Sequence, residues 1–597
     1  MDLKSKDEQN LTQLSNEDGT INDKDAPDKE EKIPMAESTN NPNNSLTNEE
    51  EDIDFIFDNI VGGGDGGDLG QWIILAALIP IGLCAGFPLF MHLFACYEPK
   101  HRCFVNSCDN LTKVSNIDSS WIAFGIPTND GSEGQTCQAE MLKDDEKYDS
   151  CHMYSQIDES TCELHSFNKS SIQNCQVFVY DKSVVIESFT TKFNLVCEME
   201  YKQMILGVMV MIGLTVGSEI GGRLGDKFGR KRVMLFSTLV IVPTVMFAGY
   251  SPNFWTYAIL KFLCTAALPC IWVSSHTLII EIFGKDHRKN AVVIKEVLWP
   301  FGGLGLVIVF YLTRHWTYFH LWTGALCAIA IPAFLIIPES PRWLSVNCKG
   351  EIAESVFLKI ARWNRRNLSH DDKLKINSIL RRLENNVDTN QEKKLGFRDM
   401  MNSKNVNKTI IIMLNWIIVC VTTFTLALNV THLSGNVFLN TALLAFLGDL
   451  PGKLIVGVTL KFFSRRFNLF ACQFLVGLFC VVVAILPKEY NMVLITFYLL
   501  AMCSSNAAFT LVYLITGELY PTNLRNQAIG TCSTVSRIFG ISAPFMSKLA
   551  CIWKPLPMLT LGLPSILIAF LVYFLPETKY INLPQTMTES CKQNRTN

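Results

Sequence analysis

The sequence predicts an all-α integral membrane protein with twelve transmembrane helices in two six-helix halves. Apolar residues make up 49% of its 597 positions. They collect into runs of roughly 18 to 25 residues, the length that a helix needs to cross about 30 Å of hydrocarbon. Basic residues recur in alternate short loops between these runs, as expected for the cytosolic side of a membrane. Short charged motifs also recur in both halves, which indicates an internal repeat.

Six apolar runs precede a polar stretch and six follow it. The first six helices are expected near residues 72–95, 203–221, 233–250, 254–281, 291–312 and 317–337. The second six are expected near residues 409–430, 435–460, 467–487, 491–515, 526–550 and 555–575.

The segments outside these spans are polar. Residues 1–51 hold almost no aromatic side chain and cannot bury enough apolar surface to offset chain entropy. The pattern of a cleaved signal peptide is not visible, so the first span is expected to direct insertion. We expect a disordered acidic cytosolic N-terminus (1–70), a first bundle (71–344) with an extracellular loop (96–201), a cytosolic connector (345–408), a second bundle (409–578) and a cytosolic tail (579–597).

The basic loops predict the orientation in the membrane. They follow spans 2, 4 and 8 and contain Arg223, Lys227, Arg230, Lys231 and Arg232, then Lys285, Arg288 and Lys289, then Lys461, Arg465 and Arg466. A loop of the other side, residues 251–253, has no basic residue. The positive-inside rule places the basic loops in the cytosol. An even number of spans then places both termini there too, in a multi-pass protein of the plasma membrane.

The long first loop has the composition of an extracellular domain. It holds eight of the twenty cysteines and two glycosylation sequons, at Asn110 and Asn168. Clustered cysteines indicate disulfides. Eight cysteines allow 105 pairings, so none is assigned, and Cys96 is expected at the membrane edge. The disulfide candidates are Cys103, Cys108, Cys137, Cys151, Cys162, Cys175 and Cys197.

Charged motifs repeat between the halves at a nearly constant offset. Span 4 ends in a segment from Glu281 to Arg288, and span 10 in one from Glu518 to Arg525, 237 residues later. Spans 6 and 12 end in Pro-Glu-Ser and Pro-Glu-Thr at an offset of 238. The loop after span 2, with Asp226 and Arg230, has a weaker counterpart 235 residues later. Two related six-helix halves explain this pattern.

These charges predict a cytosolic gate. Ion pairs between neighbouring helix ends would hold the two bundles together while the inside is closed. The alternative is simple anchoring of helix ends, which needs basic residues but not the repeated acids. In the second copy Lys461 stands where an acid is expected. The predicted gate residues are Asp226, Arg230, Glu281, Arg288, Glu518 and Arg525.

Several motifs resemble known families. Residues 222–231, Gly-Arg-Leu-Gly-Asp-Lys-Phe-Gly-Arg-Lys, resemble the signature of the major facilitator superfamily. The long cysteine-rich loop, the run Pro-Glu-Ser-Pro-Arg-Trp-Leu at 338–344 and Ala-Arg-Trp-Asn at 361–364 resemble the organic ion transporters of solute carrier family 22. The resemblance extends from about residue 99 to 578. It implies two six-helix bundles around a central cavity, with no ATP site and no cofactor.

Within that resemblance, two basic residues favour an anionic substrate. Lys453 lies where anion-preferring members place a lysine, and Arg537 where they place an arginine. A charge in mid-membrane is costly, so Arg537 should face a water-filled cavity and meet a carboxylate. The alternatives are pairing of Lys453 with Asp449, or its extension to an interface, and a bond from Arg537 to a helix carbonyl.

Acidic and aromatic residues in the spans are also compatible with a cationic substrate. Asp449 or Glu296 would serve a cationic group, although Glu296 could simply pair with Lys295. A zwitterion with its carboxylate on Arg537 and its amine on an acid fits both sets. Aromatic side chains in the spans that could line a cavity include Trp272, Trp299, Phe301, Phe424 and Tyr513, but most membrane aromatics pack or anchor. The predicted substrate residues are Arg537, Lys453, Asp449, Phe424, Glu296 and Trp299.

Other functions have little support in the sequence. The Gly-rich segment at 62–67 fits a dinucleotide-binding pattern, but it precedes a membrane span, and Asp65 and Asp68 would repel a pyrophosphate. No metal cluster or catalytic triad is visible, so we expect neither an enzyme nor a nucleic-acid partner. We expect alternating-access transport of a small organic anion or zwitterion, with a counter-ion or exchange substrate left open. The alternatives are an organic cation or amine transporter and a non-transporting sensor.

Overall fold

The computed structural model describes residues 55–62, 68–95, 97–109, 121–128, 148–157, 161–283, 285–347, 349–389, 400, 406–428, 437–487, 489–520 and 522–577. Eleven helical segments within these ranges are long and apolar enough to cross a membrane. Each coincides with one of the predicted spans.

The first half contains six spanning segments. They are α2 (Leu69–Ala95), α5 (Tyr201–Phe228), α6 (Arg230–Ala248), α7 (Phe254–Ile282), α8 (Lys285–Thr313) and α9 (Trp316–Ala328), which a 3-10 turn (Pro332–Leu335) extends. Gly229 joins α5 to α6 with a φ of 99°, a conformation that favours glycine. A side chain there would also collide with the Glu339 carboxylate.

The second half repeats this arrangement. It contains α14 (Val406–Leu428), α15 (Val437–Phe446), α16 (Leu450–Phe462), α17 (Arg465–Ile485), α18 (Asn491–Leu519), α19 (Thr522–Gly540) and α20 (Leu556–Leu571), the last extended by a 3-10 turn (Val572–Phe574). The helix α19 and the 3-10 segment η7 (Ala543–Cys551) occupy the place of the predicted eleventh span. Polar residues and Arg537 make α19 less apolar than the other spans.

Span 8 is interrupted, contrary to the prediction of one continuous helix over 435–460. The helix α15 ends at Phe446 and α16 begins at Leu450, with a turn between them. Pro451 in the first turn of α16 is compatible with a helix start. The interruption places Asp449 at the N-terminal end of α16, within the bundle.

The expectation of disorder throughout residues 1–70 is wrong at its C-terminal end. Residues Ile56–Val61 form a π-helical turn, η2, and α2 begins at Leu69. Ile56, Phe57, Ile60 and Val61 are buried. Phe57 packs on Phe357 of α11 with ring centroids 5.1 Å apart. Apolar burial therefore orders this short segment; residues 1–54 and 63–67 lie outside the described ranges.

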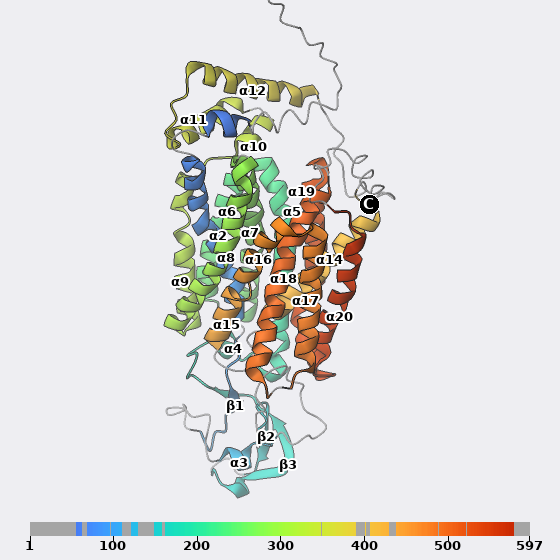
Figure 1. Cartoon of the computed structure of the whole chain (residues 1–597). Helices are drawn as coiled ribbons and strands as arrows, with labels where there is room; N and C mark the ends of the chain where they lie inside the picture. Colours follow the sequence, from blue (N-terminus) through green and yellow to red (C-terminus); the bar gives the residue numbers. More distant parts are fainter. Residues whose placement is uncertain are drawn as a thin grey trace, which may run out of the picture. The chain divides into compact units, whose positions relative to one another are not determined.

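The connector is largely helical. It contains α10 (Pro341–Val346), α11 (Gly350–Trp363) and α12 (His370–Thr389). Asn364 ties it to the first span, since its side chain accepts a hydrogen bond from the Gly70 N–H at 2.6 Å and donates one to the Val61 carbonyl at 2.9 Å. In Figure 1, α11 and α12 lie beyond one end of the helices, here called the connector end.

The first loop forms a small folded region at the opposite end, here called the strand end (Figure 1). Strand β1 (His101–Cys103) pairs antiparallel with β4 (Phe178–Tyr180), and β2 (His152–Gln156) pairs with β3 (Phe167–Asn174). Short helical turns α3 (Ile122–Gly125), η3 (Leu164–Ser166), α4 (Phe189–Lys192) and η4 (Cys197–Met199) complete it.

Within the described residues, three disulfides hold the loop, Cys103–Cys175, Cys108–Cys162 and Cys151–Cys197. Six of the seven candidate cysteines are therefore paired, and Cys137 lies outside the described residues, as does Cys96. The sequon at Asn168 falls on an exposed position of β3, where a glycan would meet no packed neighbour. The sequon at Asn110 lies outside the described residues.

Two seams join the halves. In the first, α5 packs on α19 and η7. The Glu200 carboxylate bonds the Lys548 ammonium at 2.6 Å, and Gly207 packs so closely on Pro544 that an added Cβ would lie 2.7 Å from the proline Cγ. In the second, α8 packs on α15 and α16, and Phe310 meets Phe438 with ring centroids 5.7 Å apart. Both seams hold the bundles together at the strand end.

Candidate functional site

A buried cluster of charges lies where the second seam reaches the middle of the bundle. The interruption of span 8 presents Asp449 and Lys453, one helical turn apart, to Glu296 of α8. The Lys453 ammonium lies 3.0 Å from the Asp449 carboxylate and 3.6 Å from the Glu296 carboxylate. It also donates to the Glu296 backbone carbonyl at 3.3 Å. One lysine from the second half is thus compensated by an acid from each half.

The cluster is withdrawn from solvent. The Lys453 and Asp449 side chains are each 10% exposed and that of Glu296 is 18% exposed. Burial makes charge compensation essential, because an unpaired charge in such surroundings costs several kcal/mol. One oxygen of Asp449, Oδ1, is nevertheless buried without a hydrogen-bond partner among the described residues. Asp449 can therefore accept a further donor.

Aromatic rings adjoin this cluster. Trp272 of α7 and Trp299 of α8 meet edge to face with centroids 4.5 Å apart. Trp299 also approaches Phe90 of α2 at 5.9 Å. The flat contact with α2 depends on Gly86, where a Cβ would come within 3.1 Å of the indole. Tryptophan faces beside carboxylates are the surroundings that bind ammonium groups in proteins.

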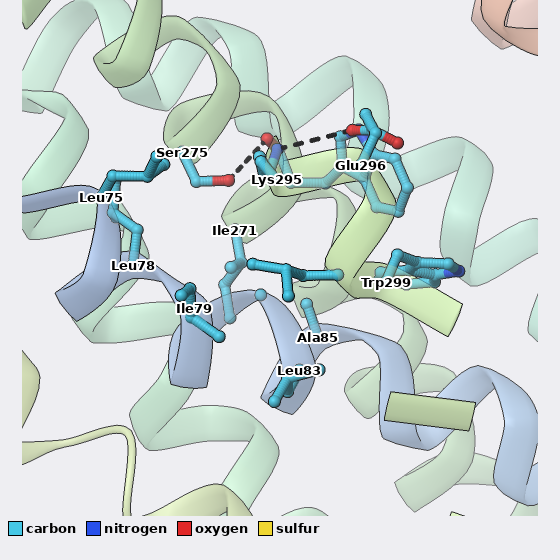
Figure 2. A pocket seen from close by; sticks show the side chains of 13 residues that line it. Leu75, Leu78, Ile79, Leu83, Ala85, Ile271, Ser275, Lys295, Glu296 and Trp299 are labelled. Atoms are coloured by element: carbon cyan, nitrogen blue, oxygen red, sulfur yellow. Dashed lines mark hydrogen bonds and ion pairs between the residues drawn. The ribbon is translucent and has the colours of Figure 1, made fainter. Parts of the chain in front are cut away.

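A small cavity opens against these rings (Figure 2). Its polar lining comes from Ser275, Lys295 and Glu296, and its apolar lining comes mainly from α2. The free space of about 30 Å³ is sufficient for a water molecule or two and much smaller than the few hundred Å³ of a typical ligand site. Access for an organic substrate therefore requires these helices to move.

Lys295 is the charged residue of this cavity that is not among the substrate residues predicted from the sequence. Its ammonium lies 4.0 Å from the Glu296 carboxylate and 5.3 Å from the centroid of the Trp272 ring. The nitrogen is buried and donates no hydrogen bond to the described residues. The sequence signal, a Lys-Glu pair inside an apolar span, was present but was interpreted as a local charge pair.

Arg537 lies apart from the cluster, on α19 in the first seam. Its guanidinium donates to the Leu214 carbonyl of α5 at 3.3 Å, the helix-carbonyl alternative that the sequence left open. The described residues provide no carboxylate within ion-pair distance of it. Phe424 packs at the edge of the hydrophobic core of the first half.

The predicted gate residues form two similar clusters at the connector end. In the first half, Arg230 lies 3.0 Å from Asp226 and 3.1 Å from Glu281. Glu339 accepts hydrogen bonds from the backbone N–H groups of Arg230 and Lys231, at 2.8 and 3.1 Å. This network fixes the tight turn between α5 and α6.

The second half repeats the network with one member changed. Arg465 lies 3.4 Å from Glu518, and Glu577 accepts the backbone N–H groups of Arg465 and Arg466 at 2.8 and 3.3 Å. Glu339 and Glu577 belong to the recurring Pro-Glu motifs at the ends of spans 6 and 12. They are not among the predicted gate residues. The Arg288 and Arg525 side chains lie outside the described residues. These contacts each lie within one half, so the predicted gate between the halves stays a prediction.

Neutralising one acid of each network tests how much each network contributes to transport. Glu281→Gln should lower the initial rate of uptake about fivefold, because Arg230 is largely buried and loses the charge of a buried partner. Glu518→Gln should have a smaller effect, since its contact is longer and Lys461 replaces the second acid. Uptake normalised to surface expression measures both variants. A larger loss in Glu518→Gln would contradict this order.

The chain matches a known family of membrane transporters over most of its length. The family model described as "Sugar (and other) transporter" matches residues 170–589. The chain belongs to that family. This transporter also resembles an organic cation transporter-like protein of Drosophila melanogaster, with 28% identity over 71% of this chain and 76% of the relative.

Two mammalian relatives match over more of the chain. Solute carrier family 22 member 4 of Mus musculus is 28% identical over 88% of this chain and 93% of its own length. Organic cation/carnitine transporter 2 of Rattus norvegicus is 27% identical over 87% of this chain and 92% of its own length. The predicted resemblance to the major facilitator superfamily and to solute carrier family 22 is confirmed, and the protein is a multi-pass membrane transporter of organic ions.

A solved structure supports the fold. The proton:xylose symporter XylE bound to 6-bromo-6-deoxy-D-glucose aligns with a TM-score of 0.56 and 14% identity, over 87% of this chain and 98% of the symporter. At this identity the likeness concerns the fold alone, and it confirms the predicted all-α major facilitator architecture.

Proposed function

We propose that this transporter carries small organic cations across the plasma membrane by alternating access, including ammonium compounds that also carry a carboxylate, such as carnitine. The observation that supports this most directly is the surplus acceptor of Asp449. Two carboxylates surround Lys453, so its charge is already compensated. One Asp449 oxygen remains without a hydrogen-bond partner among the described residues, and Glu296 of the same cluster lines a cavity together with Trp272 and Trp299.

This proposal departs from the anion preference expected from Lys453. A lysine in contact with two buried acids offers little net positive charge to an anion. The relatives named as organic cation and organic cation/carnitine transporters agree with the cationic alternative. We therefore propose that Lys453 compensates Asp449 and Glu296 and does not set a preference for anions.

Arg537 suits the carboxylate of a zwitterionic substrate. Its described hydrogen bond goes to a backbone carbonyl, which leaves guanidinium donors available for an acceptor. The substrate carboxylate would then bind Arg537 and the substrate ammonium would bind Asp449, so each substrate charge would meet an opposite charge.

We infer that the strand end faces outward and that the connector end and both termini lie in the cytosol. The disulfides of the loop suit an oxidising exterior, and the basic clusters of Arg230 and Arg465 suit the cytosolic side. In this orientation both seams close the exterior. Rocking of the halves about the central charges would expose the site to alternate sides. The connector-end networks would serve as the inner gate.

A substrate panel tests the proposal. Cells that express the transporter should accumulate labelled tetraethylammonium and carnitine above vector-transfected cells, and should not accumulate labelled glutarate. Uptake of the dicarboxylate without either ammonium compound would overturn the assignment. Uptake of none of the three, with the protein at the cell surface, would also count against it.

A single variant separates the two ammonium substrates. Arg537→Met should lower carnitine uptake at least tenfold, because a charge-assisted bond to the substrate carboxylate is lost. Tetraethylammonium has no carboxylate, so its uptake should stay within about twofold and provides the internal control. An equal loss for both substrates would assign Arg537 a structural role instead.

A further inference from the structure

The Lys295 side chain is held by the same groups that would recognise an ammonium substrate. Its nitrogen lies 5.3 Å from the Trp272 ring centroid and 4.0 Å from the Glu296 carboxylate. An aromatic face and a carboxylate are the two elements of ammonium recognition. Figure 2 places Lys295 and Glu296 together at the cavity, above the apolar side chains of α2.

The arrangement does not satisfy Lys295 itself. An ammonium group has three N–H donors, and this one uses none of them on the described residues although the nitrogen is buried. A buried charged group without hydrogen bonds is destabilising and calls for an explanation. Structural stabilisation does not explain it, because a leucine or methionine would fill this apolar position at lower cost.

The neighbouring lysine provides a contrast within the same cluster. Lys453 bonds Asp449, the Glu296 carbonyl and the Glu296 carboxylate, so its position is fixed by several partners. Lys295 approaches Glu296 only at 4.0 Å and donates no hydrogen bond to the described residues. Of the two ammonium groups in this cluster, Lys295 is the one that can leave without breaking a hydrogen bond.

We propose that Lys295 is a tethered cation that occupies the ammonium position of the empty site and is displaced by the substrate. The inference rests on the proposed function, since it assumes a cationic substrate group. While the site is empty, Lys295 partly neutralises Glu296 and covers the Trp272 face. When substrate enters, its ammonium takes over both contacts and the flexible lysine chain swings away. Because the substrate must displace Lys295, it binds more weakly than it would to a site without this lysine. Weaker binding favours release.

The experiment compares Lys295→Met with Lys295→Arg in the full-length transporter. Methionine keeps a flexible chain of similar size and removes the charge. The Michaelis constant for tetraethylammonium should fall about fivefold to tenfold in Lys295→Met, because the built-in competitor is gone, and should stay within about twofold in Lys295→Arg. Lys192→Met is the matched control, since Lys192 lies over Trp316 in the loop region at 4.8 Å, remote from the site.

A binding measurement makes the result independent of transport. Quenching of tryptophan fluorescence by tetraethylammonium in the purified protein should shift to lower concentration in Lys295→Met, by a similar factor. An unchanged or higher half-saturation in both assays would overturn the inference. If the wild type binds tetraethylammonium but does not transport it, the proposed function fails while the displacement result still decides the role of Lys295. If Lys295→Met does not reach the membrane, Lys295→Gln replaces it.

Discussion

Replacement of Asp449 by asparagine is expected to lower tetraethylammonium uptake at least about 100-fold. Two losses combine in this variant. The substrate loses its carboxylate partner, and Lys453 loses the nearer of its two acids, at 3.0 Å. Truncating one member of a buried charge pair costs about 3–5 kcal/mol, and about 1.4 kcal/mol corresponds to a factor of ten. Initial uptake rates, normalised to protein at the cell surface, measure the effect.

A double variant separates the two losses. Asp449→Asn combined with Lys453→Met removes the pair together, so no uncompensated lysine remains. Its thermal stability should recover relative to Asp449→Asn, because removing both partners avoids a buried unpaired charge. Its uptake should stay low if Asp449 contacts the substrate. Full recovery of uptake in the double variant would show that Asp449 only compensates Lys453.

A partly exposed aspartate of the loop region, Asp181, provides the matched control. Asp181 lies in the loop region and accepts a hydrogen bond from the Ser183 N–H at the surface. Asp181→Asn makes the same chemical change without touching the cluster, so its uptake should equal that of the wild type. Comparable losses in Asp181→Asn would point to a general effect on folding or delivery.

Hydropathy predicted the helices because the membrane imposes one requirement on every span. A span must satisfy its backbone hydrogen bonds internally and present apolar side chains over about 30 Å. That requirement fixes length and composition but not continuity. The interruption at residues 447–449 was therefore missed, although Gly448, Asp449 and Pro451 are typical of a turn followed by a helix start. The interruption matters because it positions Asp449 and Lys453.

Composition averaged over a long window concealed the ordered part of the N-terminal segment. Ile56, Phe57, Ile60 and Val61 are few beside the many acidic and polar residues before them. They become buried because α11 of the connector, some 300 residues later, provides the apolar partner for Phe57. Nothing local in the sequence indicates that contact.

Contacts within one helix of the site could be predicted from the sequence, but contacts between helices could not. Lys453 and Asp449 are one turn apart on a helix, so their pairing followed from spacing. The contact of Lys453 with Glu296, which belongs to the other half, could not be predicted from spacing. Lys295 and Trp272 come from α8 and α7, and sequence spacing carries no information about a distance across two helices. Charge type and mid-span position identified most of the candidates, and the tertiary fold determined their partners.

Gly207→Trp is expected to abolish transport. Gly207 of α5 packs against Pro544 of η7, where even a Cβ would lie 2.7 Å from the proline Cγ. The helix backbone and the proline ring cannot yield as a flexible side chain would, so an indole must force α5 and η7 apart. The strand end of the first seam would then stay open. A transporter that cannot close this seam cannot complete the alternating cycle.

The seam itself can be measured. Cysteines in place of Glu200 and Lys548, whose long side chains meet at 2.6 Å, should be joined by a bifunctional methanethiosulfonate reagent that spans the length of the two side chains, when no other residue is changed. The cross-link should be lost when Gly207→Trp is added. Gly305→Trp is the control, because a Cβ at Gly305 meets no atom within 4 Å, and it should keep both the cross-link and most of the uptake. Persistent uptake in Gly207→Trp would mean that transport does not require closure here. A persistent cross-link without uptake would place the defect elsewhere than at the seam, since the halves would still meet at Glu200 and Lys548.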